Sequence, residues 1–152
     1  MKYVQGHHKT PGCVFCNEMK RPDGPQNLIV HRGSGAFVIL NRFPYTSGHL
    51  MVVPYSHSGT LDLLDPAILS EMMELVTKST TVLSEVYHPD GFNIGANIGR
   101  AAGAGIADHL HWHIVPRWIG DTNFMSTLGE TRVLSELLEV TYHNVHLAWR
   151  AL

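Results

Sequence analysis

The sequence predicts an α+β fold in which a long central helix and a C-terminal helix pack against an antiparallel β-sheet. Three observations support this class. Short apolar runs separated by turn residues come first, a long stretch with helical spacing follows, and further strand-like runs precede a second helical stretch. Hydrophobic residues make up 44% of the 152 residues and charged residues 16%, which suits one globular domain over residues 1–152.

The first half of the chain predicts a β-hairpin and a third strand. Apolar runs at residues 28–31 and 36–40 flank the turn Gly33-Ser34-Gly35, a pattern that is typical of a hairpin. Residues 41–48 contain Pro, Ser and Gly and are expected to form a loop. The apolar run 49–54 then predicts the next strand.

The middle of the chain predicts one long helix from Pro66 to about residue 87. Asp65 is a suitable N-cap, and proline is favoured in the first turn of a helix. Apolar residues keep approximately helical spacing along this stretch, as an amphipathic helix requires: Ile68, Met72, Leu75, Val76, Leu83 and Val86. A turn at residues 89–91 ends it.

The second half predicts two strands and a last helix. Strands are expected over residues 92–98 and 109–116, and a loop of small residues at 99–105 lies between them. Helical spacing resumes over about residues 131–149. Because strands and helices follow each other in this order, an antiparallel sheet is favoured over a doubly wound parallel sheet.

Charge and hydropathy exclude several classes of protein. The formal net charge of -2 at pH 7 argues against broad nucleic-acid binding, which needs a basic face, but permits a small phosphate pocket. No apolar run approaches the roughly 20 residues that span a bilayer. Residues 1–27 are rich in Gly, Pro and polar groups, so we expect an irregular segment without the apolar core of a secretion signal. We therefore expect a cytoplasmic protein.

Three histidines alternate with apolar residues in the run His109-Leu110-His111-Trp112-His113-Ile114-Val115. In a strand the three imidazoles would share one face, and the apolar side chains would face a core. The first interpretation is a solvent-exposed polar face on which three histidines occur by chance, but such a face would normally also contain Thr, Lys, Glu and Ser. A metal site is a second interpretation. The third is a row of catalytic imidazoles acting on phosphate, because imidazole can attack phosphorus and donate hydrogen bonds near pH 7.

The pattern H-x-H-x-H, with apolar residues between the histidines, resembles the signature of the histidine triad (HIT) family. Further blocks are similar in the family's order and extend the resemblance over most of the chain: residues 13–16, 36–41, 48–54, 91–97 and 109–116. Residues 116–125 resemble the branch of bacterial diadenosine-tetraphosphate phosphorylases and fragile-histidine-triad-like proteins. The resemblance implies the HIT fold, a nucleotide substrate and a homodimer.

The resemblance also implies roles for four histidines. His111 would attack the α-phosphorus and form a covalent nucleotidyl-imidazole, which water or phosphate then cleaves. One ring nitrogen of this imidazole must hold its proton against an acceptor, which in the family is a backbone carbonyl. His113 would hydrogen-bond the phosphate or the leaving oxygen, and His109 would orient the site together with His49.

Four further positions would contact the substrate. Asn41 matches the residue that holds the ribose, although an asparagine that ends a strand as a turn residue is the alternative. Asn97 matches the polar residue near the α-phosphate. Gly105 and Ile106 stand where many members have Gln, Ser or Thr, so backbone N–H groups of a glycine-rich loop would have to replace those contacts. The alternative is a loop that needs glycine only to turn.

Cys13 and Cys16 have the spacing of zinc ligands, but two ligands do not complete a site. Zinc-bearing relatives add a histidine after the third strand and the first histidine of the triad, here His57 and His109. That set would be a closed structural zinc site, whereas two thiols without a metal are the alternative. A redox role is disfavoured, because the pair lies in a predicted loop without a βαβ context. No organic cofactor is implied.

The leading functional hypothesis is a nucleotidyl transferase or hydrolase that cleaves dinucleoside polyphosphates such as Ap4A or Ap3A at the α-phosphate. Phosphorolysis of Ap4A would give ADP with ATP, whereas hydrolysis would give AMP. A nucleoside phosphoramidase is an alternative, which the longer loop between Asn97 and His109 disfavours. A nucleotide-binding module without turnover is another alternative, which the intact triad disfavours.

Overall fold

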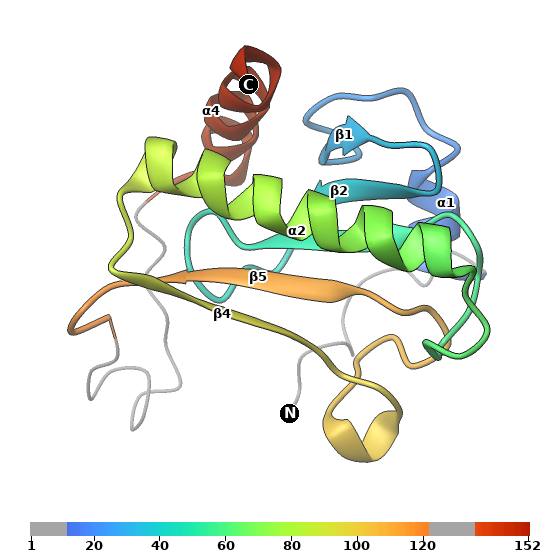
Figure 1. Ribbon diagram of the computed structural model, residues 1–152. Helices are drawn as coiled ribbons and strands as arrows, with labels where there is room; N and C mark the ends of the chain where they lie inside the picture. Colours follow the sequence, from blue (N-terminus) through green and yellow to red (C-terminus); the bar gives the residue numbers. More distant parts are fainter. Residues whose placement is uncertain (1–11, 122–135) are drawn as a thin grey trace.

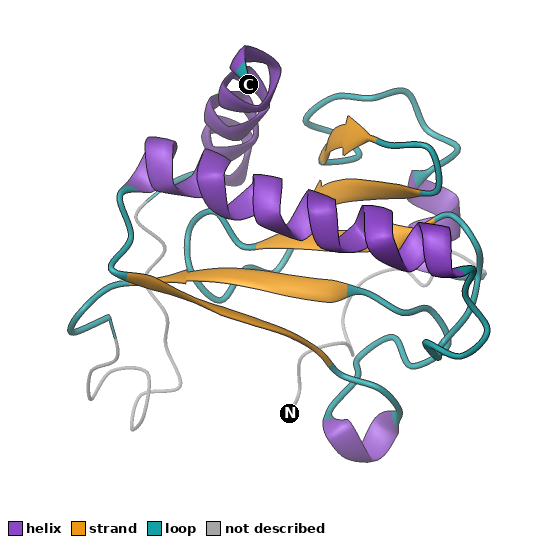
Figure 2. Ribbon diagram, in the orientation of Figure 1, coloured by secondary structure: helices purple, strands orange, loops and turns teal. Residues whose placement is uncertain are grey.

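An antiparallel sheet with the strand order β1-β2-β3-β5-β4 forms the centre of the molecule (Figure 1). The structure is a computed structural model and describes residues 12–121 and 136–152. Within these ranges the sheet has five strands: β1 (Ile29–Arg32), β2 (Ala36–Leu40), β3 (Leu50–Pro54), β4 (Gly91–Ala96) and β5 (Trp112–Arg117). Figure 2 shows the strands side by side, with one long helix running across them. The predicted α+β class is confirmed.

The predicted hairpin joins β1 to β2, which pair antiparallel. Its turn rests on the carboxylate of Glu71, which accepts hydrogen bonds from the backbone N–H groups of Ser34 at 2.5 Å and Gly35 at 2.6 Å. A Cβ atom on Gly35 would lie 2.9 Å from Cγ1 of Ile68. The glycine is therefore needed for the close approach of the turn to the helix that carries Glu71 and Ile68.

The predicted central helix is α2 (Pro66–Tyr87), which crosses the sheet in Figure 1. Asp65 caps it, because its Oδ1 atom accepts a hydrogen bond from the N–H of Ala67 at 2.8 Å. The helix ends at His88, which adopts the left-handed conformation with φ 46°. Its fully buried side chains face the sheet and form the core with β2 and β3: Met72, Leu75, Val76, Ser79, Val82 and Leu83.

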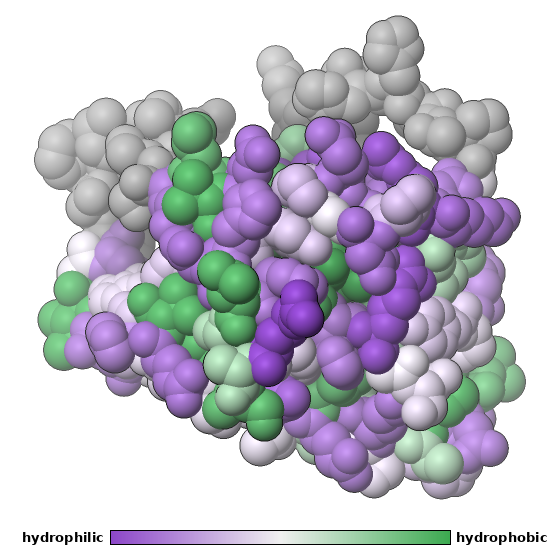
Figure 3. Space-filling view, turned by 90° about the horizontal axis from the view of Figure 1, so that it is seen from above, coloured by the Kyte–Doolittle hydropathy of each residue, from purple (hydrophilic) through white to green (hydrophobic). Residues whose placement is uncertain are grey.

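The C-terminal helix α4 (Leu138–Ala151) begins later than predicted. Residues 131–135 of the predicted helix lie outside the described residues, and residues 136–137 precede α4. The carboxylate of Glu136, which precedes the helix, accepts hydrogen bonds from the hydroxyls of Tyr87 and Thr141. Val145 and Trp149 are buried, so this face of α4 belongs to the core. On the face seen in Figure 3, hydrophilic and hydrophobic residues lie side by side.

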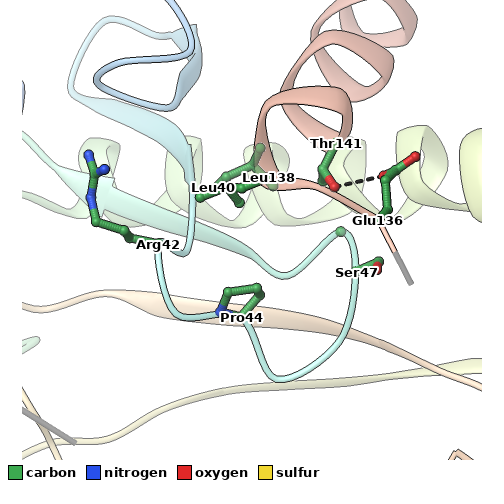
Figure 4. A pocket seen from close by; sticks show the side chains of 8 residues that line it. Leu40, Arg42, Pro44, Ser47, Glu136, Leu138 and Thr141 are labelled. Carbon is green, nitrogen blue, oxygen red and sulfur yellow. Dashed lines mark hydrogen bonds between the residues drawn. The ribbon is translucent and has the colours of Figure 1, made fainter. Parts of the chain in front are cut away.

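A small cavity of about 70 Å³ lies between the loop after β2 and the start of α4 (Figure 4). Leu40 and Leu138 lie side by side in its lining, and Glu136 lies next to Thr141, whose hydroxyl donates to its carboxylate. None of the histidines of the predicted site lines this cavity. The carboxylate of Glu136 is already hydrogen-bonded to Tyr87 and Thr141. The cavity therefore lies apart from the candidate site.

Besides the start of α4, three predicted boundaries were wrong. The N-terminal segment contains a short helix, α1 (Val14–Glu18), so Cys16 lies in a helix and Cys13 at its N-cap. This single turn depends on tertiary packing, because its Phe15 side chain is only 3% exposed. Strand β4 ends at Ala96, and the following loop contains the 3₁₀ helix η1 (Arg100–Ala102).

The third wrong boundary is the start of β5, which begins at Trp112 and not at His109. The last pairs of the sheet join Trp112 to Val52 and to Ala96. Beyond Val52 the neighbouring strand ends in Pro54, which has no N–H to donate, and its carbonyl oxygen lies 2.9 Å from Nε2 of the His109 ring. The alternation of histidine and apolar residues in the sequence thus begins at His109, three residues before the strand begins at Trp112.

No helix in residues 12–121 and 136–152 is both long and apolar enough to cross a membrane.

Candidate active site and metal cluster

The imidazole of His111 is held in one tautomer. Its Nδ1 atom lies 2.9 Å from the carbonyl oxygen of His109. Because a carbonyl oxygen only accepts, Nδ1 carries the proton and Nε2 keeps its lone pair. Burial lowers the pKa of His111, which favours the neutral ring, and the residue is 5% exposed. The neutral ring therefore offers Nε2 as a nucleophile.

His49 sets the tautomer of His113 in the same way. The backbone N–H of Tyr45 donates to Nδ1 of His49 at 3.1 Å, so the proton of His49 is on Nε2. That Nε2 atom lies 2.9 Å from Nδ1 of His113 and donates to it. The proton of neutral His113 is therefore on its Nε2 atom, which can donate to an anionic oxygen. Burial, with the nearby His111, lowers the pKa of His113 to about 4.

The nucleophile and the donor lie next to each other. The ring centroids of His111 and His113 are 4.8 Å apart, and those of His49 and His113 are 5.1 Å apart. The ring of Tyr45 covers both His49, at 4.8 Å, and His113, at 6.2 Å. These imidazoles form one contiguous cluster in which a lone pair on His111 lies beside an N–H donor on His113.

His109 contributes its ring to a different group. Its Nδ1 atom lies 3.3 Å from Sγ of Cys13, 3.7 Å from Sγ of Cys16 and 3.2 Å from Nδ1 of His57. Its Nε2 atom lies 2.9 Å from the carbonyl oxygen of Pro54, so Nε2 carries the proton and Nδ1 a lone pair. The row of three imidazoles is thus divided between two neighbouring sites, and His109 lies with the other three zinc ligands that the resemblance implied.

The four residues of this second group, Cys13, Cys16, His57 and His109, form what we call the metal cluster. One ligand atom from each lies within 4.8 Å of the others. Ligands of a tetrahedral zinc ion with thiolate and imidazole bonds are roughly 3.3–3.8 Å apart. The separations of 3.2–3.7 Å between His109 and its neighbours match that spacing. Cys16 and His57 fit as well, since their Sγ and Nδ1 atoms are 3.4 Å apart. The donor set and its spacing fit a structural zinc ion.

The HIT domain model matches residues 23–118, a range that contains His49, His57 and the three histidines of the triad.

The chain belongs to the HIT family.

Similar proteins agree with this membership. A relative from Mycobacterium tuberculosis named AP-4-A phosphorylase is 39% identical over 132 residues, which cover 87% of this chain and 68% of that protein. A histidine triad nucleotide-binding protein from Sulfolobus tokodaii has a TM-score of 0.74 and 27% identity, and the match covers 91% of this chain and 93% of the other. A zinc-bound histidine triad family protein from Mycobacterium smegmatis has a TM-score of 0.73 and 26% identity, covering 91% and 94%.

Of the four substrate positions expected from the HIT resemblance, Asn41 has a direct contact with an imidazole. Asn41 contacts His49, because its Nδ2 atom lies 3.4 Å from Nδ1 of that ring while its Oδ1 atom accepts from the N–H of Phe43. Asn97 follows Ala96, the residue paired with Trp112 at the start of β5. Gly105, which is exposed, and the partly buried Ile106 lie in the loop that leads to His109.

Two contacts of this HIT site were missed by the sequence analysis. Tyr45 donates its backbone N–H to His49, and its ring covers two imidazoles. The only signal for this contact in the sequence is the position of Tyr45 four residues before His49. The ring of Phe15 packs against His109 at 5.3 Å and His111 at 5.1 Å. Both contacts depend on how segments outside the strands, the loop after β2 and the helix α1, fold back onto the sheet.

Proposed function

We propose that this HIT protein is a nucleotide phosphorylase or hydrolase that cleaves dinucleoside polyphosphates at the α-phosphate. The observation that carries the proposal is the pair formed by His111 and His113, in which a lone pair on Nε2 of one ring lies beside an N–H donor of the next. The identity of 39% to the relative named AP-4-A phosphorylase supports the substrate class.

The first step would be an attack of His111 Nε2 on the α-phosphorus. A nitrogen–phosphorus bond forms, the bond from phosphorus to the bridging oxygen breaks, and the electron pair leaves with that oxygen. The carbonyl oxygen of His109 stabilises the positive charge that develops on the ring, because it accepts the Nδ1 proton. The Nε2–H of His113 is available to the leaving oxygen, which gains negative charge.

The second step would transfer the nucleotidyl group from His111 to an acceptor. With inorganic phosphate, Ap4A gives ADP and ATP in total, and with water it gives AMP and ATP. Backbone N–H groups of the loop that contains Gly105 and Ile106 would contact the phosphates, since these positions lack the polar side chains of many relatives. Asn41 and Asn97 would contact the ribose and the α-phosphate.

The metal cluster would act as a cross-link. A zinc ion bound there would be structural, because Cys13, Cys16, His57 and His109 fill a tetrahedral shell without an open position. The four ligands come from the start of α1, from the segment after β3 and from the segment before β5. The cluster would thus join the N-terminal segment to the residues that precede the catalytic strand.

A homodimer and a single domain over residues 1–152 are part of the same proposal. Strand β4 lies at the edge of the sheet, and its Ile94 side chain is 45% exposed, which suits contact with a second copy. Light scattering would test the dimer, and a mass equal to one chain would contradict it.

The test of function is incubation of the protein with Ap4A, with and without inorganic phosphate, followed by chromatographic separation of the nucleotides. ADP and ATP that form only with phosphate would establish a phosphorylase, and AMP formed without phosphate a hydrolase. If neither ADP nor AMP forms from Ap4A, the proposal is contradicted. Turnover of an adenosine phosphoramidate in its place would then indicate a phosphoramidase, and tight AMP binding without turnover a binding module.

A further inference from the structure

The nucleophile lies outside the hydrogen-bonded part of the sheet. Strand β5 begins at Trp112, so His111 precedes the last backbone pairs that join β5 to its neighbours, Val52 and Ala96. Regular pairing therefore does not fix the backbone of His111. Besides the ring contact with His113, three contacts hold His111 and the residues just before it. Each of these three involves a metal-cluster ligand or a residue next to one in the sequence.

The first contact comes from the segment between the two cysteines. Phe15 lies between Cys13 and Cys16 in α1 and is 3% exposed. Its ring centroid is 5.1 Å from that of His111 and 5.3 Å from that of His109. Any group that fixes both thiols also fixes Phe15, because Phe15 directly precedes Cys16 and only Val14 separates it from Cys13.

The second contact is the carbonyl oxygen of His109, which accepts the Nδ1 proton of His111 at 2.9 Å. The ring of His109 is held at both nitrogens, by the carbonyl of Pro54 and by the metal cluster. The third contact is the backbone N–H of Leu110, which donates to the carbonyl of Ser58 at 2.6 Å. Ser58 directly follows the ligand His57.

We infer that the metal cluster positions the nucleophile, and that Phe15 is the positioning residue that transmits its state to His111. This inference rests on the proposed function for the role of His111. With a metal bound, the thiols and imidazoles hold α1, His57 and His109 together, and the proton of His111 stays on Nδ1. Without a metal ion, nothing binds the four ligands together, and Phe15 and the carbonyl of His109 shift. His111 then also populates the tautomer that is protonated on Nε2, and this tautomer cannot attack phosphorus through Nε2.

The test is the tautomeric state of His111 measured by NMR on protein with ¹⁵N-labelled histidines, with the signals of His111 assigned by their absence in His111→Gln. We compare zinc-loaded protein with protein stripped by a chelator and then reloaded with zinc. The expected result is an Nδ1–H pattern with zinc, loss of that pattern without zinc and its return on reloading. Unchanged His111 signals after zinc removal, or failure of the protein to bind zinc at all, would overturn the inference.

Phe15→Leu tests the transmitting residue. This variant keeps all four ligands, so we expect about one zinc ion per chain together with a partial loss of the Nδ1–H pattern and a decrease in kcat of about tenfold. Phe37→Leu is the matched control, because Phe37 is equally buried but packs on Tyr55. It should lower stability and leave the His111 signals unchanged, and a similar change in both variants would contradict the positioning role.

The NMR measurement does not depend on turnover. A protein that fails to cleave Ap4A but changes the tautomer of His111 with zinc would contradict the proposed function and keep the coupling. A protein that cleaves Ap4A but whose His111 signals do not change on zinc removal would support the proposed function and contradict the coupling.

Discussion

The Nδ1 atom of His111 lies 2.9 Å from the carbonyl oxygen of His109, two residues earlier in the chain. This hydrogen bond determines which nitrogen of His111 is free, because the carbonyl oxygen can only accept. The ring of His109 meanwhile belongs to the metal cluster. A single residue therefore takes part in both candidate sites, with its backbone in one and its side chain in the other.

Replacement of His111 should remove turnover without unfolding the protein. We expect His111→Gln to lower kcat for Ap4A by about 10⁴-fold or more, since no other group supplies the nucleophile. The circular dichroism spectrum should stay that of the folded protein. His143→Gln, on the exposed face of α4, is the control and should keep full activity. Comparable activity in both variants would exclude His111 as the nucleophile.

Replacement of His49 should impair the donor. His49→Ala removes the N–H group that donates to Nδ1 of His113, so the tautomer of His113 is no longer fixed. We expect kcat to decrease by about 10²-fold. Because His49 is fully buried, a decrease in Tm should accompany it. Steady-state kinetics and thermal unfolding check both effects, and an unchanged kcat would show that His113 does not depend on this partner.

Acidification should destabilise the protein through His113. Burial and the nearby His111 lower the pKa of this imidazole from 6.5 to about 4 in the folded protein. Between these values the unfolded chain binds more protons, so the stability contributed by neutral His113 is present above pH 6.5 and is lost as the pH falls toward 4. Turnover should decrease in the same direction, because a proton on Nδ1 breaks the hydrogen bond from His49.

Profiles of Tm and kcat/KM between pH 4 and pH 8 check this pH dependence. His113→Gln is the matched variant, in which the contribution of this group to the Tm profile should disappear. A Tm profile that is the same in His113→Gln and in the natural sequence would contradict the assignment.

The metal cluster should hold one zinc ion per chain. Protein purified without added metal should contain about one equivalent by elemental analysis, and removal by a chelator should lower Tm, because the ion binds only the folded arrangement of its ligands. Cys16→Ser should lower the zinc content. Zinc far below one equivalent in the natural sequence would favour two thiols without a metal.

The hairpin turn should depend on the charge of Glu71. Glu71→Gln keeps the shape of the side chain but weakens the hydrogen bonds from Ser34 and Gly35, and we expect the free energy of unfolding to decrease by ~1–2 kcal/mol. Urea unfolding measures it. Glu74→Gln, at an exposed position of the same helix, should change little. Equal effects of the two substitutions would indicate a general charge effect on α2.

The sequence predicted those parts of the fold that local signals determine. Asp65 and Pro66 marked the start of α2, and the turn between β1 and β2 contained its glycines. The start of β5 could not be predicted, because side-chain alternation continues to His109 while pairing stops at Trp112. The short helix α1 was missed because it depends on burial of Phe15.

In the candidate site, too, local sequence signals predicted some features, while others depend on tertiary packing. The three triad histidines and the two cysteines were found from their spacing, and His49 and His57 from the resemblance to the family. The structure brings them together in two groups. The contact between Asn41 and His49 and the cover formed by Tyr45 come from the path of the loop after β2. The resemblance to the family had already given His109 as a zinc ligand, and the structure places its ring in the metal cluster.

The central claim is that His111 forms a covalent nucleotidyl intermediate. The most direct measurement is mass spectrometry of protein mixed with Ap4A in the absence of inorganic phosphate and quenched during turnover, followed by digestion and fragmentation. We predict that the mass of one adenylyl group is added to the peptide that contains His111, and that the addition disappears when phosphate is supplied or in His111→Gln. An adenylyl group on another residue, or turnover of Ap4A without any protein-bound adenylyl group, would contradict the account.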